Sequence, residues 1–223
     1  RAERAALLSD SRQPLFNRAI SGTYSPGSTI KPLMALAGLK EGVIQSEGEV
    51  YSSGALTVPN PYDAEHPSTF LDWKAHGWVN VVSAIARSSN IFFYILGGGV
   101  PPRVPVADLV RGAINPKGLG IDRIKHYWQE LGFADKTGID LPFEAASLLP
   151  DPAQKQKRTG EPWRLGDTYN ASIGQGDFQV TPIQLVSFMA SIANGGTLWR
   201  PHLLAGEGAE RIADHTSWST ELA

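Results

Sequence analysis

The composition of this 223-residue chain, 42% hydrophobic and 19% charged, is that of a globular protein large enough for one sizeable core or two small ones. Its formal net charge of -2 gives no reason to expect a nucleic-acid partner, because phosphate binding needs clustered positive charge. The absence of cysteine excludes disulfide and thiolate chemistry, and the five histidines have no metal-ligand spacing, so we expect no metal.

The first element predicted along the chain is a helix over residues 28–39, which stops before Gly42. Its apolar residues recur at helical spacing and comprise Ile30, Leu33, Met34, Ala37 and Gly38. Pro32 is compatible with this helix because it falls in the first turn, where backbone N–H groups have no intrahelical partner. The same turn presents free N–H groups and a positive partial charge around Ser28.

Extended segments and further helices follow this first helix. Residues 49–61 are predicted to form short extended segments around a glycine. Apolar spacing then predicts four helices, over residues 80–96 and near residues 104–112, 121–131 and 181–194. The stretch 143–166 is rich in Pro, Gly and charge, which predicts a long surface loop. Because strand signals are few and short, the chain is predicted to be mostly helical.

No run of apolar residues reaches the roughly 18 to 20 that a membrane-spanning helix needs. The first residues do not form a signal peptide, and the chain does not begin with Met. We therefore expect an excised piece, with any anchor or targeting segment outside these 223 residues.

Three short motifs carry the chemistry of the sequence: Ser28-Thr29-Ile30-Lys31, Ser88-Ser89-Asn90 and Lys136-Thr137-Gly138. Ser28 and Lys31 fall on one face of the predicted helix, because residues three apart are neighbours there. A serine hydroxyl needs a base within hydrogen-bond reach, and the sequence has no G-x-S-x-G elbow or nearby histidine to supply one. Lys31 can be that base if burial or a neighbouring cation lowers its pKa from about 10.4 by roughly two or three units.

Each motif also has a structural explanation when taken alone. An S-x-x-K occurs often by chance, as a helix start followed by a solvated lysine. Ser88 and Asn90 would equally serve as a helix N-cap. The surrounding sequence is therefore needed to choose between these explanations.

The stretches around the motifs resemble class B penicillin-binding proteins, the monofunctional transpeptidases of bacterial wall synthesis. The resemblance begins with Asn17-Arg18-Ala19 and the serine segment 22–32. It continues through Trp73, His76-Gly77 and the second-motif region 84–94. Later landmarks follow in the family's order at residues 137–142, 173–176, 181–184 and 193–196. The resemblance covers about residues 14–201 and is nearest to elongation-type members.

This resemblance implies a fold and a set of site residues. The fold would be an α-rich fragment of the α/β transpeptidase fold of penicillin-binding proteins and serine β-lactamases, with few short strands and the central sheet largely missing. Residues 1–223 would form part of one transpeptidase domain. The implied catalytic residues are Ser28 as nucleophile, Lys31 as base, Ser88 as proton relay to the leaving amine, and Asn90 as a hydrogen-bonding partner of substrate and of Lys31.

The implied activity is that of a peptidoglycan D,D-transpeptidase at the outer face of the bacterial cytoplasmic membrane. Its partners would be stem peptides ending in D-Ala-D-Ala, β-lactams and other wall-synthesis membrane proteins, and no cofactor is implied. A serine β-lactamase is less favoured, because no E-x-x-L-N string with a base for deacylation occurs after Asn90. A non-catalytic β-lactam sensor or wall-binding module, and a structural module without chemistry, remain open alternatives.

The tripeptide Lys136-Thr137-Gly138 is expected to be a decoy. In the family the third motif lies on a strand at the edge of the cleft, whereas Lys136 precedes the landmark at 173–176. No second K-T-G or K-S-G occurs in the chain. We therefore expect Lys136 to lie away from the nucleophile, the isolated chain to be inactive or nearly so, and its sheet-facing surface to be unusually apolar.

Overall fold

The structure, a computed structural model, describes residues 2–60, 63, 65–205 and 208–222. Arg1, Pro61 and Ala223, which the expectations above included, lie outside these residues. The helices are α1 (Ala2–Ser9), α2 (Lys31–Lys40), α3 (Val81–Arg87), α4 (Asn90–Gly98), α5 (Val106–Leu109), α6 (Ile121–Glu130), α7 (Pro152–Thr159), α8 (Leu165–Ser172), α9 (Pro182–Ala193) and α10 (Ser219–Leu222), with the 3-10 helices η1 (Gly27–Ile30) and η2 (Thr216–Trp218). The strands are β1 (Glu49–Ser52), β2 (Ala55–Val58), β3 (Ser68–Leu71), β4 (Gly77–Val79), β5 (Val110–Arg111), β6 (Thr197–Trp199) and β7 (Arg211–Asp214).

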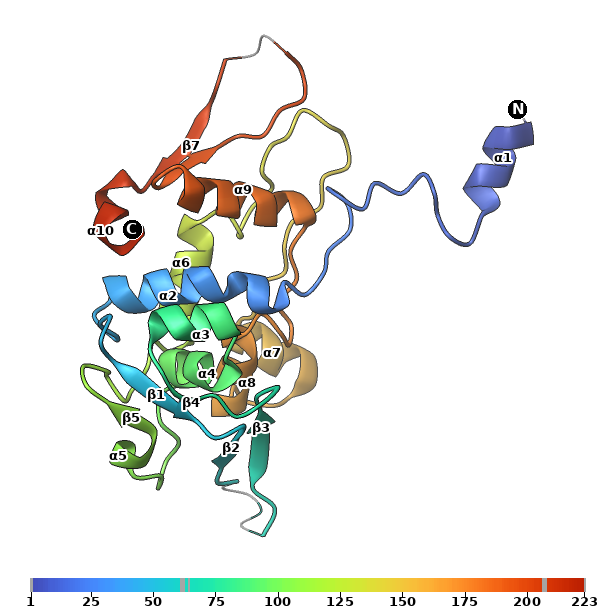
Figure 1. Cartoon of the computed structure of the whole chain (residues 1–223). Helices are drawn as coiled ribbons and strands as arrows, with labels where there is room; N and C mark the ends of the chain where they lie inside the picture. Colours follow the sequence, from blue (N-terminus) through green and yellow to red (C-terminus); the bar gives the residue numbers. More distant parts are fainter. Residues whose placement is uncertain (1, 61–62, 64, 206–207, 223) are drawn as a thin grey trace.

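The core is built around two helices, α2 and α4. In α4 every residue from 91 to 97 is buried, as expected for a helix that is apolar on all sides and has neighbours all round. It packs against α2, α8 and β1. Gly97 permits the close approach of α8, because a Cβ at this position would lie 1.8 Å from Ser172 Oγ. In Figure 1, α2 crosses the middle of the molecule between α9 on one side and α3 and α4 on the other.

The sheets in the described part of the chain are small and antiparallel. One has three strands in the order β4-β1-β5, with Val50 opposite both Val79 and Val110. The other two are the pairs β2-β3 and β6-β7. Val50 and Ser52 of β1 are buried, which fits the period of two along a strand with one face on the core. The expected helix-rich fold with few short strands is confirmed.

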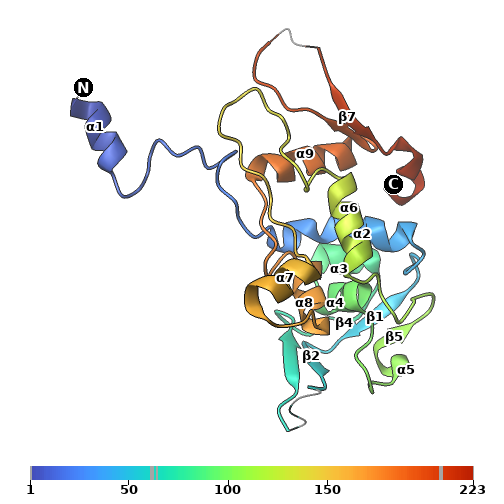
Figure 2. The same cartoon turned by 180° about the vertical axis from the view of Figure 1, so that it is seen from behind.

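The first helix, α1, lies outside this core. It stands away from the rest of the molecule in both views of the chain (Figures 1 and 2). Its residues from Glu3 to Ser9 are exposed. None of the helices in the described ranges is long and apolar enough to cross a membrane.

Several expected elements agree with the structure. The helices predicted near 121–131 and 181–194 correspond to α6 and α9, and the segment 28–39 forms η1 followed by α2. The prediction of one helix near 104–112 is wrong in its length, because only the four residues of α5 are helical and β5 follows at once. Val110 pairs with Val50 of β1, and this tertiary contact outweighs the local helical spacing.

The long surface loop predicted over 143–166 is also wrong in part, because it contains α7 and the start of α8. The helix α7 begins with Asp151, whose side chain accepts from Gln154 N at 2.9 Å, followed by Pro152 in the first turn. None of the residues of α7 is buried. A helix without a buried face leaves no apolar periodicity in the sequence, so only its cap could have indicated it.

Candidate active site

The side-chain amine of Lys31 lies at the centre of the candidate site. Lys31 is the first residue of α2 and is only 1% exposed. Its Nζ donates to Ser88 O at 2.8 Å, to Ser88 Oγ at 3.0 Å and to Asn90 Oδ1 at 2.8 Å. It also lies 5.4 Å from the centre of the Phe93 ring. Three acceptors match the three hydrogens of an ammonium group, which is how a buried cation avoids a large desolvation cost.

Burial changes the acidity of this amine. Desolvation lowers the pKa of Lys31 from 10.5 to about 8, although the negative charge of Asp72 opposes the shift. A lysine whose pKa lies near 8 is partly neutral at neutral to slightly alkaline pH and then has a lone pair that can accept a proton. Of the two causes considered from the sequence, burial and a neighbouring cation, burial is the one that acts.

The hydroxyl-bearing residue Ser28 lies in an open groove of about 670 Å³ that also contains Lys31 and Ser88. Ser28 belongs to the 3-10 helix η1 and is exposed, so its hydroxyl is accessible from solvent. The opposite wall of the groove belongs to α9 and consists of Leu185, Val186, Met189, Ala190 and Ala193. Lys31 N donates to Ser28 O, but among the described residues no hydrogen bond joins the Ser28 hydroxyl to the Lys31 amine. Ser28, Lys31 and Ser88 therefore share one groove, and Asn90 contacts the Lys31 amine without lining the groove.

The turn at residues 88–90 interrupts the single helix that the sequence predicted over 80–96. Ser88 has φ 53° and ψ 41°, the left-handed conformation, and ends α3, while Ser89 caps the start of α4. Val82 and Ile85, two of the apolar residues whose spacing indicated that helix, are 69% and 40% exposed. The break aims both oxygens of Ser88 at the amine of Lys31, which a continuous helix would not do.

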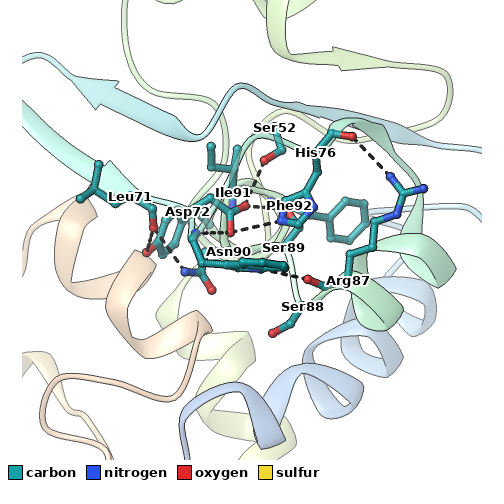
Figure 3. Close-up of polar contacts among 12 residues, drawn as sticks. Ser52, Leu71, Asp72, His76, Arg87, Ser88, Ser89, Asn90, Ile91 and Phe92 are labelled. Atoms are coloured by element: carbon teal, nitrogen blue, oxygen red, sulfur yellow. Dashed lines mark hydrogen bonds and ion pairs between the residues drawn. The ribbon is translucent and has the colours of Figure 1, made fainter.

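Segment 71–73 holds this turn from behind, and its role was missed in the sequence. Leu71 O accepts from Asn90 Nδ2 at 3.3 Å, and Trp73 Nε1 donates to Arg87 O at 3.0 Å. Between them, the carboxylate of Asp72 faces the start of α4 (Figure 3). The available signal was an acidic residue inside the apolar and aromatic stretch Phe70-Leu71-Asp72-Trp73, because a carboxylate buried there needs several hydrogen-bond donors.

Lys136 lies outside this site. It is in a loop rather than a strand and lines a different hollow, with Glu130 among its neighbours. The next two residues are held by the buried carboxylate of Glu144, which accepts from Thr137 N at 2.7 Å and from Gly138 N at 3.0 Å. The position of Lys136 away from Ser28 is the one expected from the order of the landmarks.

No group of three or more His, Cys, Asp or Glu side chains suited to a metal ion occurs among the described residues. The groups that meet at the site are the hydroxyl of Ser28, the buried amine of Lys31 and the hydroxyl of Ser88, which line the groove, and the amide of Asn90, which contacts that amine. This set can support nucleophilic attack with proton transfer through the chain's own side chains.

The fold is that of a penicillin-binding transpeptidase domain: the chain belongs to the family described as penicillin binding protein transpeptidase domain, whose model matches residues 2–221. The peptidoglycan D,D-transpeptidase MrdA of Acinetobacter baumannii is 36% identical over 209 residues, which are 92% of this chain and 28% of that protein. A penicillin-binding protein (PBP2) from Helicobacter pylori has a TM-score of 0.77 at 29% identity, and the match covers all of this chain and 38% of that protein chain. A complex between PBP2 and MreC from the same organism has a TM-score of 0.76 at 29% identity, over all of this chain and 37% of that one.

These relatives confirm the expected kinship with elongation-type class B penicillin-binding proteins. The chain spans less than a third of the curated relative that it matches.

Proposed function

We propose that the full-length gene product is a serine D,D-transpeptidase that cross-links peptidoglycan through an acyl-enzyme on Ser28. The observation that carries this proposal is the buried amine of Lys31, held by Ser88 and Asn90 in the same groove as the exposed Ser28. Membership of the transpeptidase family supports the reaction class. The expected substrate is a stem peptide that ends in D-Ala-D-Ala.

In the first half-reaction Ser28 Oγ attacks the carbonyl carbon of the penultimate D-Ala. The Ser28 proton passes to the lone pair of neutral Lys31 Nζ. The bond between the carbonyl carbon and the terminal nitrogen then breaks, and the leaving D-Ala gains a proton through Ser88 Oγ, which lies 3.0 Å from Lys31 Nζ. The backbone N–H of Ser28, at the start of η1, would donate to the oxyanion. The products are an ester on Ser28 and free D-Ala.

In the second half-reaction an amine from another stem attacks the ester, releases Ser28 and forms the cross-link. A β-lactam would acylate the same serine by opening its ring. Because the opened ring has no departing fragment, the adduct would block the site. A stable penicillin adduct on Ser28 is therefore the expected sign that this site reacts.

We also propose that the product acts at the outer face of the bacterial cytoplasmic membrane and works with other wall-synthesis proteins; the complex between PBP2 and MreC from H. pylori supports a role with partner proteins. The 223-residue chain alone should react weakly. The groove wall on α9 is apolar, with Val186 62% and Met189 45% exposed, and it offers no side-chain donor to the carboxylate of a stem peptide.

The test is Ser28→Ala in the full-length product, with a fluorescent penicillin and mass spectrometry. Wild type should form one adduct on Ser28, and Ser28→Ala should form none. Ser25→Ala is the matched control, because Ser25 is an exposed serine in the same segment, and it should label as wild type does. An adduct on another residue, or one that survives in Ser28→Ala, would overturn the assignment.

Two further assays separate the alternatives. Rapid turnover of a chromogenic cephalosporin would indicate a β-lactamase instead. Acylation without cross-linked product, when stem peptides are supplied to the full-length protein, would indicate a sensor.

A further inference from the structure

The carboxylate of Asp72 lies behind the turn at residues 88–90, on the side away from the groove. Asp72 is 8% exposed, and its Oδ2 accepts from Ser89 Oγ at 2.8 Å, from Ile91 N at 3.2 Å and from Ser52 Oγ at 3.0 Å. Figure 3 shows this carboxylate between Ser52 of β1 and the first residues of α4. It therefore joins the sheet to the turn that bears the Ser-x-Asn motif.

We propose that Asp72 is the positioning residue of the site, which anchors the turn at residues 88–90 and through that turn holds the amine of Lys31. The proposal rests on the proposed function, because the event that it affects is acylation of Ser28. Asp72 does not touch the substrate, and its effect passes through Ser88 and Asn90.

The first argument is mechanical. Ser88 has a left-handed backbone, which is unfavourable for a residue with a side chain and persists only when neighbouring contacts enforce it. Those contacts come from Asp72 and from the residues beside it. Ser89 Oγ and Ile91 N both bond to Asp72 Oδ2, and Asn90 Nδ2 bonds to Leu71 O at 3.3 Å. With its amide nitrogen fixed on Leu71, Asn90 presents Oδ1 to Lys31 at 2.8 Å.

The second argument is electrostatic. Burial alone would raise the pKa of Asp72, but the backbone N–H of Asn90 and the hydrogen bonds from Ser89, Ile91 and Ser52 together lower it. Asp72 is thus a carboxylate at neutral pH. Its charge favours the ammonium form of Lys31 and limits the fall of the Lys31 pKa, which stays at about 8.

Among the described charged groups on the elements around Lys31, Asp72 is the one whose charge shifts the pKa of Lys31. Tyr94 of α4 has its pKa raised to about 12 by burial and by Asp72, so it stays neutral. His76 Nε2 lies 3.6 Å from the other carboxylate oxygen, Asp72 Oδ1. Other charged groups on the helices packed against α2 have partners of their own: Arg123 of α6 with Glu41, Glu221 of α10 with Lys40, and Arg87 of α3 with His76 O.

The test measures the rate of acylation by a fluorescent penicillin against pH in the full-length Asp72→Asn protein. We expect the maximal rate to fall about 100-fold, the effect of a misplaced catalytic group. We also expect the alkaline rise in rate to move to lower pH, because loss of the negative charge destabilises the ammonium form of Lys31. Glu144→Gln is the matched control: Glu144 is also 8% exposed and binds backbone N–H groups, but it neither lines the groove nor contacts the turn at residues 88–90, so rate and pH profile should stay as in wild type.

The outcomes separate this inference from the proposed function. If wild type forms no adduct on Ser28, the proposed function fails. If wild type is acylated and Asp72→Asn is acylated at the same rate, Asp72 is not the positioning residue. The same holds if Asp72→Asn is slower but its pH profile has not moved, because a purely structural role lowers the rate equally at every pH.

Should Asp72→Asn fail to fold, two milder variants decide. Ser89→Ala and Ser52→Ala each remove one hydroxyl from the same carboxylate oxygen, but only Ser89 belongs to the turn. We expect Ser89→Ala to slow acylation about tenfold, the effect of one lost hydrogen bond, and Ser52→Ala to slow it less, because Ser52 holds Asp72 from the sheet and not from the turn. Equal rates for the two variants would overturn the proposal.

Discussion

The proposed chemistry and a measurable cost to stability both depend on the buried amine of Lys31. Its pKa of about 8 in the folded chain lies below the ordinary value of 10.5, because burial disfavours the ammonium form. The same desolvation that makes Lys31 a usable base at pH 8 therefore makes the folded state less favourable whenever the amine is protonated.

This cost predicts how the stability of the chain depends on pH. Between about pH 8 and 10.5 the unfolded chain holds a proton on Lys31 that the folded chain has lost, so the free energy of unfolding should rise with pH by the order of 2 kcal/mol. Below pH 8 both states are protonated and this contribution should be absent. Urea denaturation of the 223-residue chain across pH 7 to 11 measures it.

The control for this prediction is another lysine on the same helix. The rise should disappear in Lys31→Met and persist in Lys40→Met, because Lys40 is exposed at the other end of α2. Identical pH profiles for the two variants would show that Lys31 is not the source.

At the scale of elements, the walls of the groove depend on how the helices begin. The helix α9 starts with a reciprocal cap, in which Gln184 Oε1 accepts from Thr181 N at 2.9 Å and Gln184 N donates to Thr181 Oγ1 at 3.3 Å. Gln184 Nε2 also donates to Asp135 O at 2.7 Å, which ties the cap to the loop before Lys136. The cap is thus part of the tertiary structure as well as of the helix.

Loss of this cap should destabilise the chain. Thr181→Val keeps the shape of the side chain but removes the hydroxyl that satisfies Gln184 N, and we expect a loss of about 1 to 2 kcal/mol in the free energy of unfolding. Thr159→Val, at the exposed last residue of α7, should change it by less than about 0.5 kcal/mol. Equal losses for both variants, measured by urea denaturation, would count against a specific role of the cap.

At the scale of the whole molecule, the serine turn is held by main-chain bonds from residues that are about 150 positions later. Tyr24 and Val180 exchange both backbone hydrogen bonds at 2.9 Å, and Gly27 N donates to Gly174 O at 2.9 Å. A Cβ at Gly174 would lie 2.3 Å from Gly27 O, so only glycine permits this approach. The position of Ser28 therefore depends on the later landmark around Gly174.

A pair of glycine substitutions tests this dependence. Gly174→Ala adds a clash with backbone atoms to the strain of a positive φ, so we expect at least about 3 kcal/mol of destabilisation and slower acylation in the full-length product. Gly176 has a similar φ of 75°, but a Cβ there would make only an ordinary contact, 3.7 Å from Asn170 Cβ, so Gly176→Ala should cost only about 1 to 2 kcal/mol and leave acylation unchanged. Similar losses in both variants would refute the close-contact explanation.

The sequence by itself determined the features that depend on neighbours along the chain. The apolar residues of α6 and α9 follow a helical period, and Ser28 and Lys31 are three residues apart, so the helices and the presence of these two residues in one groove could be predicted. The order of the motifs identified the family. It also indicated that Lys136 would lie away from the nucleophile.

Only the tertiary structure decided the burial of Lys31, the break at Ser88 and the contacts of Asp72. The acceptors of the Lys31 amine are 57 and 59 residues away, and the donors to Asp72 Oδ2 come from residues 17 to 20 positions away on either side. Desolvation and hydrogen bonding depend on distances between such groups, and those distances exist only after the helices and strands have packed. The sequence could therefore name the reacting groups, but the folded core sets the acidity and the position of the base.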